Sequence, residues 1–363
     1  MTRAEVIVRG EVYTGWQELS VQRALDAAAG AFELRSVAPP GTRWPIRPGD
    51  EVVIQPEGVT EPLVTGYVDS IEAESVSDRT SLVLRGRDRT ADLVDSSAPT
   101  EPGEWSGLRL EELAREIAEP FGVPVVRLTA AGEPFERFAV QQGETAWAAI
   151  ERAARSRGAI LYTDGKGQLV LDQPGSAIAE GELVEGETVT ASRLSWTLAE
   201  RFRAYTVKAQ RTGSDQAWGE VVSGIQGVAQ DEEVQRERGL VIIAEGAITA
   251  EGAKVRAQRE AAWRRANSLV VTVTAPLWLQ GGYTGPPWRI NEQARTKLPT
   301  LTVDEYLLVR SVTFTRTASG GSSTELLLAK PDAFDLVETI PEGSSGFDEL
   351  IGGFDDDFSE GDE

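Results

Sequence analysis

The chain has 363 residues, 40% hydrophobic and 26% charged, a composition typical of a globular protein with roughly two to four domains. It contains no cysteine and no histidine, so disulfides, zinc–thiolate sites, Ser-His-Asp and Cys-His arrangements and HExxH sites are excluded. The net charge of −22, from 36 Lys and Arg against 58 Asp and Glu, argues against nucleic-acid binding because phosphates are repelled.

Residues 1–98 are predicted to form a first β-barrel-like domain. Short alternating runs are separated by Gly and Pro turns such as Pro48-Gly49-Asp50, which is typical of barrels and sandwiches. A short helix is predicted around Ser20–Ala29. The predicted strands are Ala4–Val8, Phe32–Val37, Glu51–Gln55, Leu63–Ile71 and Thr80–Arg87.

Residues 99–180 are predicted to form a small α/β domain. Ser106 is the expected cap of a helix with Leu110 and Ile117 on its apolar face. A second helix is predicted over Thr145–Arg157. The strands on either side of the turn Asp164-Gly165-Lys166-Gly167 are expected to pair as a hairpin over 159–172.

Residues 181–335 are predicted to form a second β-barrel-like domain. It includes one helix, Thr249–Ala266, with Val255, Ala262 and Trp263 expected on a common side. The predicted strands are Arg193–Thr197, Ala204–Gln210, Ser268–Ala275, Tyr306–Thr315 and Thr324–Ala329.

Residues 336–363 are predicted to form an acidic C-terminal tail. From Pro331 onward the chain holds twelve acidic residues and no Lys or Arg. Its apolar residues have the spacing of an amphipathic helix, interrupted by Gly352-Gly353, and are the candidate residues for docking on a partner. The alternative is a disordered, solubilising tail. The candidate docking residues are Phe347, Leu350, Ile351, Phe354 and Phe358.

The two β-rich regions resemble each other. In each, a tryptophan precedes an apolar strand and then an apolar triplet: Trp44, Gly66–Ile71 and Leu82–Leu84, against Trp288, Leu308–Val312 and Leu326–Leu328. Alternating strands also match by chance, so the similarity alone does not establish a duplication. The expected fold class is α+β, mainly β, with two related barrel-like domains around an inserted α/β domain.

The sequence singles out no catalytic group. It has no nucleotide-binding loop or nucleophile elbow, and Asp355-Asp356-Asp357 lacks the remaining positions of an EF-hand loop. A carboxylate pair needs only two of the 58 acids, so such chemistry stays open. We expect no enzyme, no cofactor and no metal. The acids considered are Glu111, Glu112 and Glu116 on a helix face, and Asp88, Asp92 and Asp95 after a strand.

The most specific segments of the chain are LVTGYVDSI at Leu63–Ile71 and LVLRGRDRTADLVDSS at Leu82–Ser97. They resemble the baseplate hub proteins of Mu-like phages, within the wider late-control and tail-hub superfamily. In the C-terminal half, PWRIN at Pro287–Asn291, LLVRSVT at Leu307–Thr313 and LLLAKPDAF at Leu326–Phe334 resemble the closing barrel of that family. The resemblance covers about residues 1–335 in order.

The resemblance implies a structural subunit of a contractile tail. The family forms a homotrimeric ring of pseudo-six-fold symmetry that joins the hexameric tail tube protein to the trimeric central spike protein, beside other baseplate proteins. DNA is expected only to pass through the lumen, which an acidic wall would keep from adhering. The expected location is the virion baseplate, with the host cytoplasm during assembly.

The central segment of some relatives resembles a LysM fold, and Phe138–Leu171 is expected to follow its strand-helix-helix-strand outline. We expect a structural spacer there and not a peptidoglycan-binding module. No run of 18 apolar residues occurs, so no stable membrane association is expected. Two alternatives stay open, another tail-tip structural subunit and a carboxylate-dependent cell-wall hydrolase.

Overall fold

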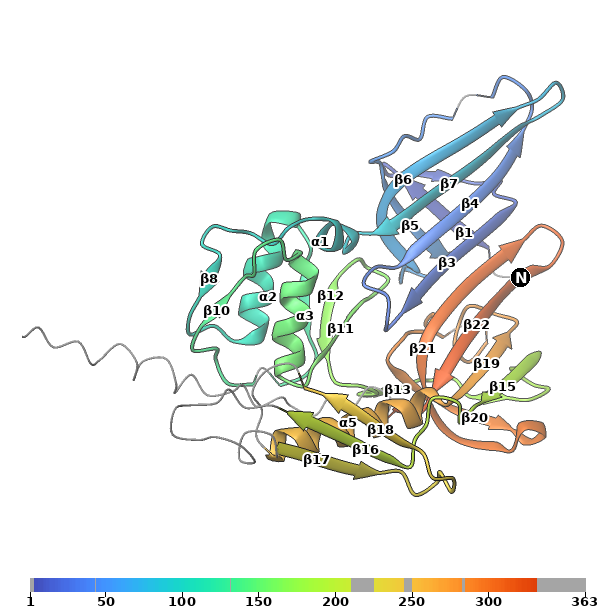
Figure 1. Ribbon diagram of the computed structural model, residues 1–363. Helices are drawn as coiled ribbons and strands as arrows, with labels where there is room; N and C mark the ends of the chain where they lie inside the picture. Colours follow the sequence, from blue (N-terminus) through green and yellow to red (C-terminus); the bar gives the residue numbers. More distant parts are fainter. Residues whose placement is uncertain are drawn as a thin grey trace, which may run out of the picture.

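The computed structural model describes residues 3–42, 44–130, 132–209, 225–244, 250–282 and 285–331 (Figure 1). Within these residues a sheet of 14 strands dominates, and three smaller sheets accompany it. The prediction of a mainly β fold with a few helices is therefore confirmed. The limits of the four predicted domains stay a prediction, because the large sheet runs through two of them without a break.

The first half of the large sheet comes from residues 4–88. Its strand order is β3-β4-β7-β6-β5-β1-β2. The helix predicted around Ser20–Ala29 is wrong, since Leu19, Val21 and Arg23 are buried at every second position, as in a strand. The strands are β1 (Ala4–Val8), β2 (Glu11–Tyr13), β3 (Glu18–Ala24), β4 (Ala31–Ala38), β5 (Glu51–Pro56), β6 (Val64–Ser75) and β7 (Thr80–Asp88).

The second half of the large sheet comes from residues 177–329. Its main path is β15-β19-β22-β21, with β20 paired to the beginning of β21 and with β13 and β14 paired to β20. The elements are β13 (Ala177–Ile178), β14 (Leu183–Val184), β15 (Ala191–Trp196), β19 (Leu269–Ala275), β20 (Glu292–Leu298), η2 (Pro299–Leu301), β21 (Val303–Thr317) and β22 (Gly321–Ala329).

The two halves share one strand plan. The order β5-β6-β7-β4-β3 in the first half corresponds to β20-β21-β22-β19-β15 in the second. Both long strands carry a β-bulge at the same place, between Val68 and Ser70 in β6 and between Val309 and Ser311 in β21. Trp44 and Trp288 lie at corresponding places, in the connections that lead into β5 and β20. The duplication that the sequence only suggested is thus present in the fold.

A central unit of two main helices and a small sheet stands beside the large sheet (Figure 1). Its helix α2 begins at Leu110 with Arg109 as the N-cap, so Ser106 is not the cap that we expected. Phe138–Leu171 contains one helix and not two, because α2 precedes it. The elements are α1 (Ala91–Asp95), β8 (Glu104–Trp105), α2 (Leu110–Ala118), η1 (Glu119–Phe121), β9 (Val125–Arg127), β10 (Phe138–Ala139), α3 (Ala146–Ser156), β11 (Ile160–Thr163) and β12 (Leu169–Asp172).

An insertion separates β15 from β19, where the first half has only the short turn between β3 and β4. Its elements within the described residues are β16 (Ala204–Ala209), β17 (Ile225–Gln230), β18 (Gly239–Ile243) and α5 (Ala250–Asn267). The residues of α5 that pack against its sheet are the buried Ala253, Ala257 and Ala261. The side predicted to carry Val255, Ala262 and Trp263 is not this buried face, since Trp263 is exposed. The helix backbone lies very close to β17, since a Cβ built on Gly227 would be 2.0 Å from the backbone nitrogen of Lys254. Only small side chains such as alanine fit on the helix face at so short a separation.

Candidate assembly surfaces

The two halves of the chain are joined directly through β3 and β21. These strands pair antiparallel from Ser311 opposite Ala24 to Thr317 opposite Glu18. Val21 and Phe314 face each other at the middle of this joint and are fully buried. One hydrophobic core therefore continues from the first half into the second.

Two strand edges have no strand beside them in the described residues, namely Ser70–Ser75 of β6 and the outer side of β15. By the shared strand plan, β6 corresponds to β21 and β15 corresponds to β3, the two strands that form the joint. In the second half, the edge of β21 is covered, since β21 pairs with β20 at its beginning and with β3 at its end. In the first half, β6 pairs with β5 over 64–67, but Ser70–Ser75 has a partner only on the β7 side. At the other end of the sheet, β15 pairs only with β19. Such edges are templates for pairing with another chain.

The hairpin β11–β12 ties the central unit to the large sheet. Thr65 Oγ1 donates to the carbonyl oxygen of Gly165 at 3.0 Å. A Cβ built on Gly165 would lie 2.0 Å from the carbonyl oxygen of Pro62, so only glycine fits at the hairpin tip. The sequence predicted this hairpin correctly but gave no sign that its turn packs against the first half of the sheet.

A cavity of about 340 Å³ lies where the hairpin meets the second half of the sheet. Burial raises the pKa of both Asp164 and Glu292, which line it. These carboxylates are already engaged, since Glu292 accepts from Gln280 at 2.6 Å and Asp164 accepts from two backbone amides of its own turn. Asp172 likewise accepts from Asn291 at 3.0 Å. The hydrogen bonds that Asn291 donates to Asp172 and to the carbonyl oxygen of Gln173 form a polar seam at this cavity, and they fasten the central unit to the second half.

The acids singled out from the sequence do not converge on a common cleft. Asp88 is buried and accepts from the backbone amides of Gly30 and Thr90, while burial raises its pKa. Asp95 forms an ion pair with Arg87, and Glu111 forms one with Arg127. Asp88, Asp95 and Glu111 therefore have structural partners within the chain.

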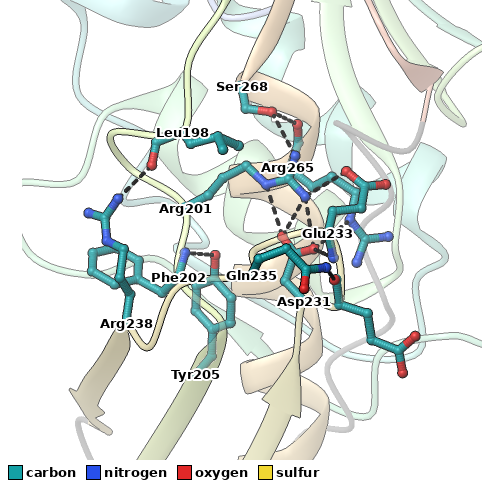
Figure 2. A network of polar contacts seen from close by, with 11 residues as sticks. Leu198, Arg201, Phe202, Tyr205, Asp231, Glu233, Gln235, Arg238, Arg265 and Ser268 are labelled. Carbon is teal, nitrogen blue, oxygen red and sulfur yellow. Dashed lines mark hydrogen bonds and ion pairs between the residues drawn. The ribbon is translucent and has the colours of Figure 1, made fainter.

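A buried ion pair anchors the insertion to the end of α5. Arg201 precedes β16 and donates three hydrogen bonds to Asp231, which follows β17, at 2.7, 2.8 and 2.9 Å (Figure 2). The side chains are 2% and 0% exposed, so this pair lies out of water. Arg201 also reaches Glu233 and the hydroxyl of Ser268. Sequence reasoning missed this network, because its members are spread over 67 residues of the chain and follow no motif.

The predicted docking residues of the acidic tail, from Phe347 to Phe358, lie outside the described residues, as does Asp355-Asp356-Asp357. Their roles stay predictions. Among the helices in the described ranges, none combines the length and the apolarity needed to cross a membrane.

Comparisons with known proteins agree with this architecture. Residues 3–88 match the family "Mu phage baseplate assembly protein GpP-like, N-terminal", and residues 90–173 match "Baseplate hub protein gp44-like, second domain". The baseplate hub protein gp44 of Escherichia phage Mu is 32% identical over 354 residues, covering 93% of this chain and 91% of that protein.

Solved tail proteins have the same fold. The 43 kDa tail protein of prophage MuSo2 from Shewanella oneidensis superposes with a TM-score of 0.84 at 29% identity, covering 94% of this chain and all of that one. A tail protein from Neisseria meningitidis MC58 gives 0.76 at 21% identity, covering 94% and 99% of the two chains. Together with the match to the phage Mu protein, these similarities show that the chain belongs to the gp44-like family of phage baseplate hub proteins, the structural subunits of a virion tail.

Proposed function

We propose that the chain forms a homotrimeric hub ring of pseudo-six-fold symmetry between the tail tube and the central spike. The observation that carries this proposal is the duplicated strand plan. Two halves with the same strand order and the same bulge lie side by side in one sheet. Three chains in a ring would present six similar units to a six-fold partner and three identical chains to a three-fold partner.

The same ring would leave a central channel. Of the 14 strands, four from each half follow one another without a break, in the order β15-β19-β22-β21-β3-β4-β7-β6. Three chains joined through these eight strands would close a barrel of 24 strands. Barrels of about 16 to 18 strands already enclose an aqueous channel. The cores and the central unit occupy one face of the sheet, and this bulk fits on the outside of a ring, where the circumference is larger. The other face would then line the lumen.

That second face suits the passage of DNA without adhesion. In the first half its arginines are engaged by carboxylates of the same chain: Arg85 pairs with Glu33 and Glu72 at 2.7 and 2.8 Å, and Arg87 pairs with Asp69 at 2.8 Å. Hydrogen bonds from Arg85 and Arg35 hold the pKa of Glu33 below its ordinary value, so it stays ionised. A phosphate would have to compete with these partners for each cation.

The central unit acts in this proposal as a spacer. Its hairpin tip is wedged against Pro62 and Thr65, and its polar seam joins it to the second half, which holds it rigidly on the ring. We assign it no peptidoglycan binding.

The acidic tail is proposed to dock on a neighbouring tail component through the residues from Phe347 to Phe358. Deletion of residues 341–363 would then weaken the attachment of that component. Unchanged particle assembly after the deletion would contradict this proposal.

Native mass measurement of the full-length chain, alone and with its tube and spike partners, tests the ring directly. A species of three chains is expected. Averaged end-on micrographs of the assembled particle should show three-fold symmetry with six similar lobes. A dimer, or a lumen blocked by the central unit, would contradict the proposal.

A further inference from the structure

The helix α5 carries a positive surface in an acidic chain. It has five Lys and Arg residues against two Glu, whereas the whole chain has a net charge of −22. Arg256, Arg259 and Trp263 are spaced three and four residues apart, so they lie on one side of the helix. Trp263 is 54% exposed. This side, here called the α5 stripe, thus offers two cations and a large aromatic ring to a partner.

The two arginines of the α5 stripe form no ion pair with any carboxylate in the described part of the chain. Glu260, the acid next to Arg259, is engaged by Arg264 at 2.6 Å. Burial and the positive charges of Arg155 and Arg256 lower the pKa of Arg259. A carboxylate bound here would relieve this repulsion between like charges and would accept charge-assisted hydrogen bonds.

The chain itself supplies a segment of the opposite charge close by. Ala329, the last residue of β22, is buried against Ala266 near the end of α5. The chain continues from there into residues 332–363, which hold twelve acids and no Lys or Arg. We propose that residues 332–342 dock on the α5 stripe of the same chain, with their carboxylates on the two arginines and their apolar side chains on Trp263.

The distances allow this docking. Along the helix, Arg259 lies about 10 Å and Arg256 about 15 Å from Ala266, at 1.5 Å per residue. An extended chain gains about 3.3–3.6 Å per residue, so a handful of residues beyond Ala329 is enough to reach both arginines. The tether also keeps the effective concentration of the segment high, so weak contacts suffice. The segment contains the acids Asp332, Asp335, Glu338 and Glu342 and the larger apolar residues Phe334, Leu336, Val337 and Ile340.

The docking occurs within one chain, so it goes beyond the hub ring and stands without it. It gives the rest of the tail a fixed starting point, because residues 343–363 then leave from the surface of the insertion. The residues from Phe347 to Phe358 are thereby presented beside α5. Since only one of the two halves carries the insertion, each chain displays them in one place.

Quenching of bimane fluorescence by tryptophan tests this docking, because the chain has no cysteine and one introduced thiol can be labelled alone. Thr339→Cys places the fluorophore between Glu338 and Ile340, and tryptophan quenches bimane only in close contact. In the full-length protein, Trp263→Phe should remove most of the quenching, since phenylalanine keeps the apolar contact without quenching. Trp44→Phe, in the first half of the chain, is the control and should leave the signal unchanged. Equal brightness with and without Trp263 overturns the proposal.

Charge reversal separates docking from mere proximity. Arg256→Glu with Arg259→Glu should release the segment and remove most of the quenching, because like charges then face one another. Adding Asp335→Arg and Glu338→Arg should restore the quenching, a result that a misfolded helix would not give. Lys254→Glu, an exposed change on another side of α5, is the matched control and should alter nothing. Quenching that survives the reversal in α5, or that the second reversal does not restore, overturns the proposal.

Mixing shows whether the contact lies within one chain. Labelled protein that carries Trp263→Phe is incubated with an excess of unlabelled protein that retains Trp263. Its brightness should stay constant. Quenching that appears on mixing places the segment on a second copy and overturns docking within the chain. A protein that shows the quenching but forms no trimer by native mass leaves this docking intact and contradicts only the hub ring.

Discussion

Arg310, the extra residue of the bulge in β21, donates to the carboxylate of Asp26 at 2.8 Å and so reaches from the second half of the chain to the turn between β3 and β4 in the first. Its backbone carbonyl accepts from Leu25 at 2.9 Å, and its second guanidinium nitrogen donates to Asn267 at the end of α5. One bulge residue thus connects both halves of the chain and the insertion.

Replacement of Arg310 by alanine should lower the free energy of unfolding by about 1 kcal/mol, since the pair with Asp26 is partly exposed and screened by water. Urea unfolding measures this loss. Arg79→Ala is the control, because its pair with Asp78 is exposed at both residues and 3.7 Å long. Equal stability of the Arg310 and Arg79 variants would show that the bulge does not strengthen the joint.

Gly165→Ala should destabilise the protein by about 1–3 kcal/mol, because the new Cβ would overlap the carbonyl oxygen of Pro62 and force the hairpin away from the sheet. Gly239→Ala provides the comparison, since nothing lies within 4 Å of its Cβ position. Thermal unfolding of the two variants should differ by several degrees. Coincident transitions would mean that the hairpin tip can move freely.

Loss of either partner of the buried ion pair should be costly. Arg201→Met leaves Asp231 charged and out of water, which is expected to cost about 3–5 kcal/mol, and Asp231→Leu should cost a similar amount. The double variant removes both charges and should recover most of the stability. Denaturant unfolding of all three variants gives the coupling energy, and a double variant as unstable as the sum of the single ones would contradict the pairing.

Acid should weaken the central unit through Glu144. Hydrogen bonds from Arg152 hold the pKa of Glu144 below its ordinary value of 4.5. Because the folded-state pKa is the lower one, the stability contributed by this pair is complete above pH 4.5 and is lost as the pH falls through the lowered value. Unfolding curves at decreasing pH should show a smaller loss for Glu144→Gln than for the unchanged chain. Parallel losses would rule out this contribution.

The sequence predicted the elements with clear periodicity and missed those set by tertiary contacts. The helix capped by Thr145 was predicted correctly, since its hydroxyl accepts from the amide of Ala148 as the cap pattern requires. Ser20–Ala29 was misread because Ala24, Ala27, Ala28 and Ala29 favour helix, and only the pairing of β3 with both β4 and β21 makes it extended.

The strands β17, β18 and β20 were not predicted at all. The strand β20 (EQARTKL) has only Ala294 and Leu298 as apolar residues, and its strand form depends on its neighbours β13, β14 and β21. The unpaired edges of β6 and β15 could not be predicted from the sequence either. The residues of these strands alternate as in any strand, but which edge stays unpaired depends on the order of all the strands in the sheet.

The insertion between β15 and β19 interrupts only one of the two copies of the strand plan. In a ring of the proposed kind, a rotation by 60° would superpose each half on the next. The strands would then coincide, but the insertion of one half would fall on the short β3–β4 connection of the other. A partner that touches only the strands would meet six equivalent seats, whereas one that touches the insertion would meet three. The two contact surfaces are encoded by separate stretches of chain, so each could diverge during evolution without disturbing the fit of the other.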